Sequence, residues 1–154
     1  MLIRTHFMFA VFMILIFFNY VNNKLIFVVM VLIATIIPDL DNPHSKYGSN
    51  IAFSPLQSVT KHRGFIHSFT TAVILVGIIA IWWPVASFGF FIGYSVHLIT
   101  DSFTKNGIRP FWPFKWEANG PITTGGKIED VLFLGLIVIN VLLFFILFIF
   151  GIWR

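Results

Sequence analysis

The chain has 154 residues, of which 58% are hydrophobic and only 10% are charged. Soluble domains carry about 25% charged residues, so this composition excludes a water-soluble cytosolic enzyme, and the high hydrophobicity excludes a disordered chain. The sequence has no cysteine, which excludes disulfides, thiolate zinc sites, iron–sulfur clusters and cysteine nucleophiles. The length indicates one domain, residues 1–154. We interpret the chain as a small integral membrane protein, in which a metal must be held by His, Asp or Glu.

Apolar runs in chain order predict five membrane-spanning helices. A spanning helix needs about 20 apolar residues to cross about 30 Å of hydrocarbon. The expected spans cover residues 3–21, 25–37, 65–83, 85–103 and 131–153. The second has only 13 apolar residues before Pro38, so we expect it to be tilted or partly buried. The expected fold is an all-α bundle of about five transmembrane helices.

The charged residues are unevenly divided between the two sides of such a bundle. Five spans place the N-terminus and the loops 38–61 and 104–129 on one side, and every acidic residue and histidine falls on or near it. Eight of the ten lysines and arginines are on this side too, against Lys24 and Arg154 opposite. By the positive-inside rule this side faces the cytoplasm, although some of these cations would alternatively serve an anionic substrate. We expect a multi-pass protein of the cell membrane.

His97 and Asp101 form an H-x-x-x-D pair near the expected cytoplasmic end of the fourth span. Residues four apart share one helix face, and Zn²⁺ accepts imidazole and carboxylate ligands together. The pair is therefore a candidate metal site, the alternative being a hydrogen bond that braces two buried polar groups. Gly93 and Ser95, nearby on the same helix, favour close helix packing.

Asp39 and Asp41 follow the second span in the segment PDLDNPHS. In the turn that Pro38 and Pro43 indicate, both carboxylates are able to converge on one ion. The alternative is simple helix termination at the level of the lipid headgroups, a role that Asp and Pro fill without any chemistry.

His62, Arg63 and His67 lie at the entry to the third span, in KHRGFIHSFT. The two histidines are candidate ligands, and the planar guanidinium of arginine suits phosphate oxygens. The alternative is a basic patch that meets anionic lipid, although lysine would serve that purpose equally well.

The remaining candidates are weaker when taken one by one. His6 and Glu129 are expected at the same membrane depth as the other clusters and are candidate outer ligands, or else packed or snorkelling residues. His44 is expected to be an ordinary loop residue. The aromatic segment RPFWPFKW, with Trp112 and Trp116, is typical of an aromatic belt at the membrane interface or of a lip that grips lipid.

Three segments, PDLDNP, HRGFIHS and GYSVHLITDSFTKNGIRPFWPF, resemble motifs of the YdjM-like family, which is described as membrane-bound metal-dependent hydrolases of bacteria and archaea. The resemblance covers nearly the whole chain and implies that its ligand-type positions are His6, Asp39, Asp41, His62, His67, His97 and Asp101. Asn42 stands where the family often has histidine, and Ile66 replaces a frequent threonine. The family's remote similarity to zinc-dependent phospholipases C implies a phosphoester site with several zinc ions.

These inferences give one expected function and two alternatives. The expected protein is a hydrolase of lipid or isoprenoid phosphoesters, with no nucleic-acid partner. Its divalent metal is expected to be Zn²⁺, in two or more copies because the ligands outnumber the four of a structural site, with Mn²⁺ or Mg²⁺ as alternatives. The expected catalytic residues are Asp39, His62, Arg63 and His67, and the expected metal ligands are His6, Asp39, Asp41, His62, His67, His97, Asp101 and Glu129. The alternatives are a metal transporter or chaperone, and a structural membrane protein whose polar pairs only brace helices.

Overall fold

The computed structural model describes residues 1–41 and 64–149. These residues form five α-helices and two short 3-10 helices, and they confirm the expected all-α class. In chain order the elements are α1 (Ile3–Phe17), η1 (Phe18–Tyr20), α2 (Lys24–Ile36), η2 (Ile37–Asp41), α4 (Phe69–Trp82), α5 (Pro84–Ser102) and α6 (Lys127–Ile149).

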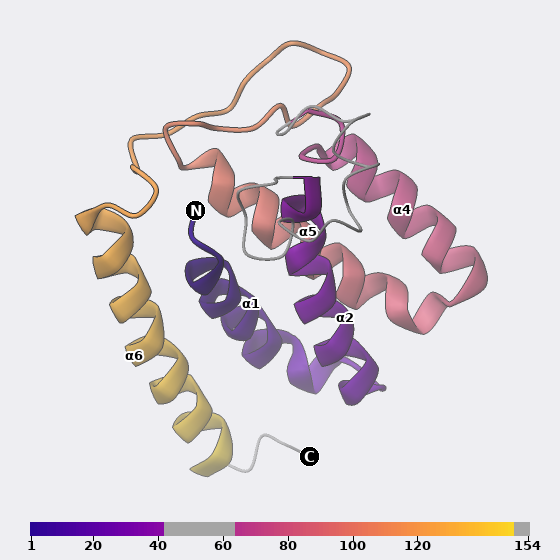
Figure 1. Cartoon of the computed structure of the whole chain (residues 1–154). Coiled ribbons are helices and arrows are strands. Elements are labelled where there is room, and N and C mark those ends of the chain that lie inside the picture. Colours follow the sequence, from indigo (N-terminus) through magenta and orange to yellow (C-terminus); the bar gives the residue numbers. More distant parts are fainter. Residues whose placement is uncertain (42–63, 150–154) are drawn as a thin grey trace.

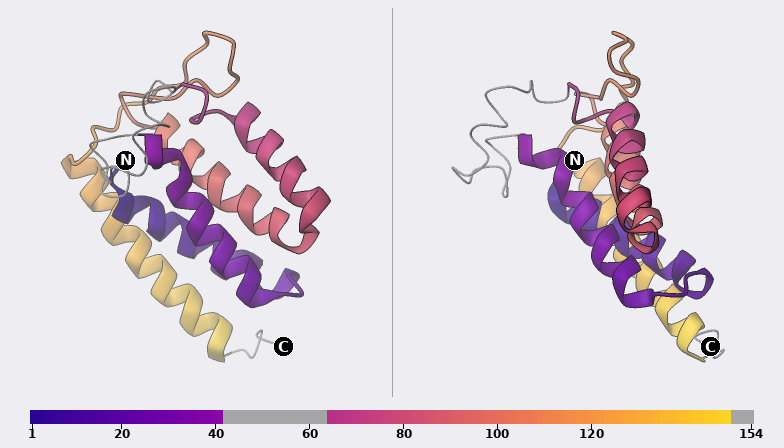
Figure 2. Two further views of the ribbon diagram at one scale, coloured as in Figure 1. Left: turned by 45° about the vertical axis from the view of Figure 1, so that its right-hand side comes forward. Right: turned by 90° about the vertical axis from the view of Figure 1, so that its right-hand side faces the viewer.

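The helices alternate in direction, as the expected five-helix bundle requires. The N-terminus, the ends of α2 and α5 and the starts of α4 and α6 lie at one end of the bundle, at the top of Figure 1. The turn between α1 and α2, the turn between α4 and α5 and the end of α6 lie at the other end, and the views in Figure 2 agree. We call these the site end and the far end.

Among the described helices, two are long and apolar enough to cross a membrane: Ile3–Tyr20, which combines α1 with η1, and Lys127–Leu147 in α6. Helix α4 is apolar but has only 14 residues, and α2 has 13, which at 1.5 Å per residue gives each a length of only about 20 Å. Helix α5 has 19 residues but carries Ser95, His97 and Asp101 in its second half.

Two expected helix boundaries need correction. Helix α4 begins at Phe69 and not at residue 65, because Ser68 caps it: the Ser68 hydroxyl accepts a hydrogen bond from the Thr71 backbone N–H at 3.2 Å. Such a cap satisfies a backbone donor that has no partner inside the helix. Helix α6 begins at Lys127 and not at residue 131, so its first turn includes Glu129 and Asp130. Acidic groups are stabilising there because the helix dipole is positive at its N-terminus.

Helix α5 is the centre of the bundle. It packs against α2, α4 and α1, while α6 packs against α1 at the edge. The contact of α5 with α2 is unusually close: a Cβ atom added at Gly93 would lie 2.2 Å from the Val31 carbonyl oxygen, and one added at Gly89 would lie 2.9 Å from that of Phe27. Glycine permits this approach of two backbones, which agrees with the close packing expected around Gly93.

Candidate metal centre

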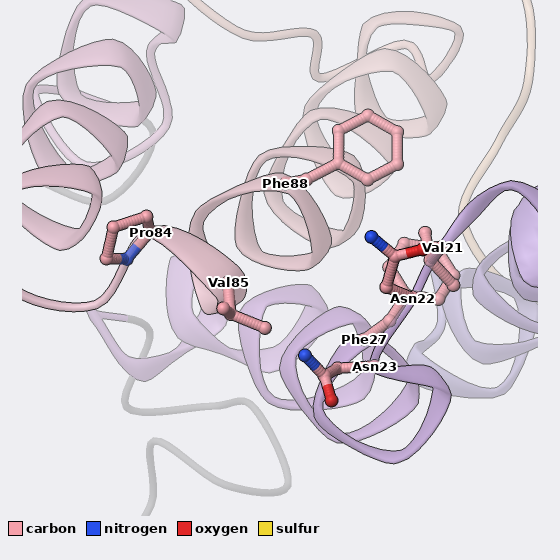
Figure 3. A pocket seen from close by; sticks show the side chains of 7 residues that line it. All are labelled: Val21, Asn22, Asn23, Phe27, Pro84, Val85 and Phe88. Carbon is pink, nitrogen blue, oxygen red and sulfur yellow. The ribbon is translucent and has the colours of Figure 1, made fainter.

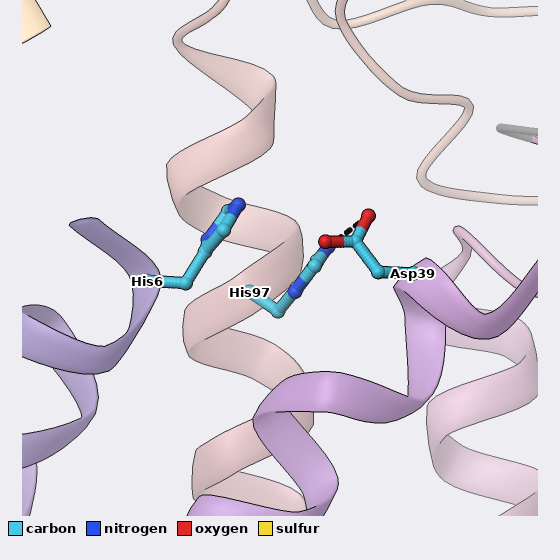
Figure 4. A group of neighbouring side chains, drawn as sticks. All are labelled: His6, Asp39 and His97. Atoms are coloured by element: carbon cyan, nitrogen blue, oxygen red, sulfur yellow. Dashed lines mark ion pairs between the residues drawn. The ribbon is translucent and has the colours of Figure 1, made fainter. Parts of the chain in front are cut away.

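Five histidine and aspartate side chains from four segments meet at the site end. Helix α1 provides His6, η2 provides Asp39, the turn before α4 provides His67, and α5 provides His97 and Asp101. The three histidines are fully buried, the Asp101 side chain is 2% exposed and the Asp39 side chain is 14% exposed. Figure 4 shows His6 and His97 beside each other with Asp39 facing His97. Asp39 is therefore the most exposed of the five side chains.

The imidazoles of His67 and His97 each lie close to the same two carboxylates. The Nε2 atoms of His67 and His97 each lie 3.8 Å from Asp101 Oδ2, and they lie 4.0 and 3.8 Å from Asp39 Oδ1. These distances are too long for hydrogen bonds. Two donors that bind one tetrahedral Zn²⁺ at about 2.0–2.1 Å are about 3.3 Å apart, so each of these four separations exceeds the spacing of ligands on one ion by less than 1 Å.

His6 reaches the same carboxylate from the other side. Its Nε2 lies 3.4 Å from Asp101 Oδ1, while Oδ2 of Asp101 faces His67 and His97. The His6 ring stacks on the His97 ring, with centroids 4.0 Å apart and an interplanar angle of 7°. Asp101 Oδ1 also accepts a hydrogen bond from the nitrogen of Met1. Both oxygens of the Asp101 carboxylate thus lie close to imidazole nitrogens of the cluster.

The contact of the second ring nitrogen of His97 determines the tautomer of the ring. His97 Nδ1 lies 2.7 Å from the Thr35 backbone carbonyl oxygen. A carbonyl only accepts hydrogen bonds, so Nδ1 carries a proton, and in the neutral imidazole the lone pair is on Nε2, which faces the two carboxylates. Second groups that fix a histidine in this way are typical of metal ligands.

The same reasoning applies to His6. His6 Nδ1 lies 2.7 Å from Thr100 Oγ1, and the Thr100 hydroxyl donates its one proton toward the carbonyl oxygens of Val96 and His97, each at 2.9 Å. The hydroxyl oxygen must therefore accept from His6 Nδ1–H, which leaves His6 Nε2 as the ring nitrogen that faces Asp101. Among the described residues, the Nε2 atoms of His6 and His97 have no hydrogen-bond partner.

This donor set fits a divalent metal. The Nε2 atoms of the histidines face carboxylate oxygens. Two groups that both offer lone pairs repel each other in a buried site, and a cation between them removes this repulsion. Two overlapping groups have donor atoms within 4.8 Å of one another: His6, Asp39 and His97, and His67, His97 and Asp101. His, Asp and no thiolate is a combination that suits Zn²⁺, with Mn²⁺ as a harder alternative.

The position of His67 depends on hydrogen bonds from neighbouring helices to the turn that carries it. The Tyr94 hydroxyl of α5 donates to the Ile66 carbonyl oxygen at 2.6 Å. The hydroxyls of Ser68 and Thr71 both donate to the Phe65 carbonyl oxygen, each at 2.6 Å. These hydrogen bonds position the His67 imidazole against α5, even though His67 lies in the turn before α4 and not in a helix.

Burial changes the acidity of Asp39, which lies in η2 after the end of α2. Loss of water contact raises the pKa of the Asp39 carboxyl above its ordinary value, while the nearby His6 acts in the opposite direction.

Glu129 is buried but serves a different purpose in this structure. Its carboxylate accepts hydrogen bonds from the Leu2 backbone N–H at 2.6 Å, the Thr5 hydroxyl at 2.8 Å and the Gly125 backbone N–H at 2.7 Å. It therefore joins the start of α1 to the start of α6, and it belongs to neither group of close donors. Through α1 it helps to position His6.

The other predicted residues are not placed. His44, His62 and Arg63 lie outside the described residues, and so does the side chain of Asp41. Conversely, sequence reasoning missed Thr35 and Thr100, which orient His97 and His6. Thr100 precedes Asp101, but its partner His6 is 94 positions away, so no local pattern indicates the contact.

A cavity of about 240 Å³ lies at the far end, between the α1–α2 turn and the start of α5 (Figure 3). It is lined by neutral side chains only: Val21, Asn22, Asn23, Phe27, Pro84, Val85 and Phe88.

Comparison with known proteins places these features in a family. The chain is 27% identical over 122 residues to inner membrane protein YdjM of Escherichia coli (strain K12), which covers 71% of this chain and 62% of the relative. It is 32% identical over 122 residues to protein YvsG of Bacillus subtilis (strain 168), covering 75% of this chain and 76% of the relative. The chain thus spans less than two thirds of the length of YdjM, and no solved structure matches it. The model of the YdjM inner membrane protein family matches residues 1–153, so this chain belongs to that family.

Proposed function

We propose that this protein is a membrane-bound, metal-dependent hydrolase that cleaves a phosphoester of a lipid or isoprenoid. The observation that carries the proposal is the buried convergence of His6, Asp39, His67, His97 and Asp101, with two imidazole Nε2 atoms that face carboxylates. A closed structural zinc site uses four ligands. A fifth donor, and a carboxylate with both oxygens in the cluster, favour more than one ion and a site able to accept substrate.

The proposed roles follow from these positions. His67, His97, Asp39 and Asp101 would hold the metal, with His6 extending the set on the other side of Asp101. Bound divalent metal supplies Lewis-acid activation of water and stabilisation of phosphoryl charge. Burial of the imidazoles excludes bulk water, and Asp39, the most exposed of the five side chains, would orient an attacking water. We further propose His62 and Asp41 as additional ligands and Arg63 as the group that binds the substrate anion.

The membrane topology belongs to the same proposal. Five alternating helices with all five donors at one end suit a bundle that crosses the bilayer five times, with its site at the cytoplasmic interface. This placement suits a substrate whose headgroup lies at the interface. A metal transporter would instead place its site near the bilayer midplane, between broken helices.

The test combines metal content with hydrolysis. Full-length protein purified in detergent would be loaded with Zn²⁺ or Mn²⁺, analysed for bound metal, and assayed for phosphate release from phosphatidic acid and from a prenyl phosphate. We expect at least one bound metal per chain and hydrolysis of one of these lipids, both lost in His97→Ala. Asn140→Ala is the matched control, because Asn140 is a buried polar residue of α6 that bonds the Met8 carbonyl oxygen, away from the centre.

The outcomes separate the alternatives. Bound metal without hydrolysis of either lipid would favour a metal carrier. Absence of metal after loading, together with equal stability losses in His97→Ala and Asn140→Ala, would favour buried pairs that only brace helices, and the proposal would then be wrong.

A further inference from the structure

An apolar cleft lies beside the turn that carries His67. It is lined by Thr70 of α4 and by the aromatic segment between α5 and α6, with Phe111, Trp112, Pro113, Phe114 and Trp116, and its volume is about 670 Å³. This volume is within the range of small-molecule sites. We call it the aromatic cleft. Its aromatic side chains are exposed, from 42% for Trp112 to 72% for Phe114.

The cleft is built on fixed contacts. The Phe69 backbone N–H donates to the Pro110 carbonyl oxygen at 2.8 Å, and the Thr70 hydroxyl donates to the Trp112 carbonyl oxygen at 2.8 Å. Arg109 and Glu117 form an ion pair at 2.7 Å where the aromatic segment begins and ends. The cleft is therefore a formed feature attached to the start of α4.

The same contacts connect the cleft to the metal centre. The Phe65 ring packs edge-on against Trp112, with ring centroids 5.0 Å apart. His67 follows Phe65 by two positions in the same turn. A molecule that fills the cleft thus lies against the turn that supplies a metal-site imidazole.

The cleft continues into an apolar face of α4. Four apolar residues of α4 are 48–78% exposed: Val73, Ile74, Ile78 and Ile81. Their spacing places them on the same side of the helix as Thr70, between Thr70 and the far end. The 14 residues of α4 span about 21 Å at 1.5 Å per residue. At the other end of this path, exposed Lys115 lies between Phe114 and Trp116 in the aromatic segment. A chain-like apolar surface that ends at aromatic rings and a cation matches a lipid with an anionic headgroup.

We propose that the aromatic cleft binds the alkyl chain of a phosphate-bearing membrane lipid and so presents its headgroup to the metal centre. The proposal rests on the proposed hydrolase function for its substrate class, while chain binding itself requires no catalysis. The cleft supplies apolar contact, α4 supplies the path along the bilayer, and Lys115 supplies attraction for the phosphate.

The experiment uses full-length protein in phosphatidylcholine vesicles that contain a phosphatidic acid with a photoactivatable diazirine at the end of one acyl chain or close to its headgroup. We expect the headgroup-proximal probe to label residues 111–116 and the chain-end probe to label the exposed face of α4. The double variant Phe111→Ala/Trp116→Ala should reduce labelling by about tenfold, since aromatic side chains dominate many binding sites. Tyr20→Ala is the matched control, because Tyr20 is an aromatic residue of η1 that is 83% exposed at the far end and lies outside α4; it should label as the wild type does.

Kinetics provide a second readout. In the wild type the KM for phosphatidic acids should fall as the acyl chains lengthen, and the double variant should lose most of this dependence with little change in kcat. Phe114→Ala, at the exposed tip, provides a milder variant if the double variant loses its thermal transition.

The outcomes distinguish the two proposals. Labelling of the cleft that is lost in the variants, without hydrolysis by the wild type, would support the cleft and overturn the hydrolase. Hydrolysis with the same labelling and the same chain-length dependence in wild type, double variant and Phe114→Ala would overturn the cleft alone.

Discussion

The two ends of the bundle are built from the same kinds of helix ends, yet their polar groups differ in burial and charge. At the far end, Asn22 and Asn23 are exposed beside a neutral cavity, so their amides are not withdrawn from the surroundings of the protein. At the site end, three imidazoles and the Asp101 carboxylate are almost completely buried. Burying a charged group costs free energy unless an oppositely charged partner or an ion compensates it. The comparison teaches that polar side chains near a helix end indicate a functional site only where the fold also buries them away from water.

The sharpest way to break this comparison is to remove a donor from the site end. His97→Ala and Asp101→Ala should each abolish metal binding and lower hydrolysis by about 10³-fold or more, with little further loss in the double variant, because residues that act as one unit are not additive. Elemental analysis and phosphate release provide the measurement. Asn23→Ala at the far end should change neither, and additive effects of the two site variants would contradict a shared ion.

The next prediction concerns the close contact of α2 and α5, which brings Thr35 to His97. Gly93→Ala should destabilise the protein by about 2–3 kcal/mol and weaken metal binding, because its Cβ would lie 2.2 Å from the Val31 carbonyl oxygen. Thermal unfolding in detergent and metal titration measure the two effects. Gly77→Ala on α4 is the control, since nothing lies within 4 Å of the added Cβ; it should be neutral or stabilise by up to about 1 kcal/mol. Similar losses in both variants would refute the close contact.

A smaller effect on metal affinity is expected from the Thr100 hydroxyl, which contacts His6 Nδ1. Thr100→Val should lower metal affinity by about 10- to 100-fold, the usual effect of removing a group that orients a ligand, because His6 Nδ1 loses its acceptor. Thr100→Ser should restore most of the affinity. If Thr100→Val and Thr100→Ser bind metal equally well, the hydroxyl does not fix the His6 tautomer.

The smallest expected effect compares two neighbouring acids at the start of α6. Glu129→Gln should destabilise by about 1–2 kcal/mol, because a charged acceptor of three hydrogen bonds is replaced by a neutral amide. Asp130→Asn removes an exposed ion pair with Arg4 and one negative charge from the first turn of α6, and it should cost about 1 kcal/mol or less. Thermal unfolding of the two variants gives the comparison, and equal losses would contradict the structural role of Glu129.

Much of the fold was readable from the sequence, for a simple reason. Apolar runs bounded by Pro84 or by polar turns specify helices locally, and the alternation of such runs fixes which ends lie together. The starts of α4 and α6 were misplaced because a cap at Ser68 and buried acids in a first turn override hydrophobicity.

The candidate site divides in the same way. The sequence alone determined the residue types: an H-x-x-x-D pair on one helix face, an aspartate after a helix end and histidines at matching depth. Only the tertiary structure decided that His67 and His97 face the same two carboxylates, that Thr35 and Thr100 fix the tautomers, and that Glu129 joins α1 to α6. These contacts connect residues up to 127 positions apart. They depend on how closely α2 approaches α5 and on where α1 meets α6, and helix packing sets those distances through side chains that are far apart in the chain.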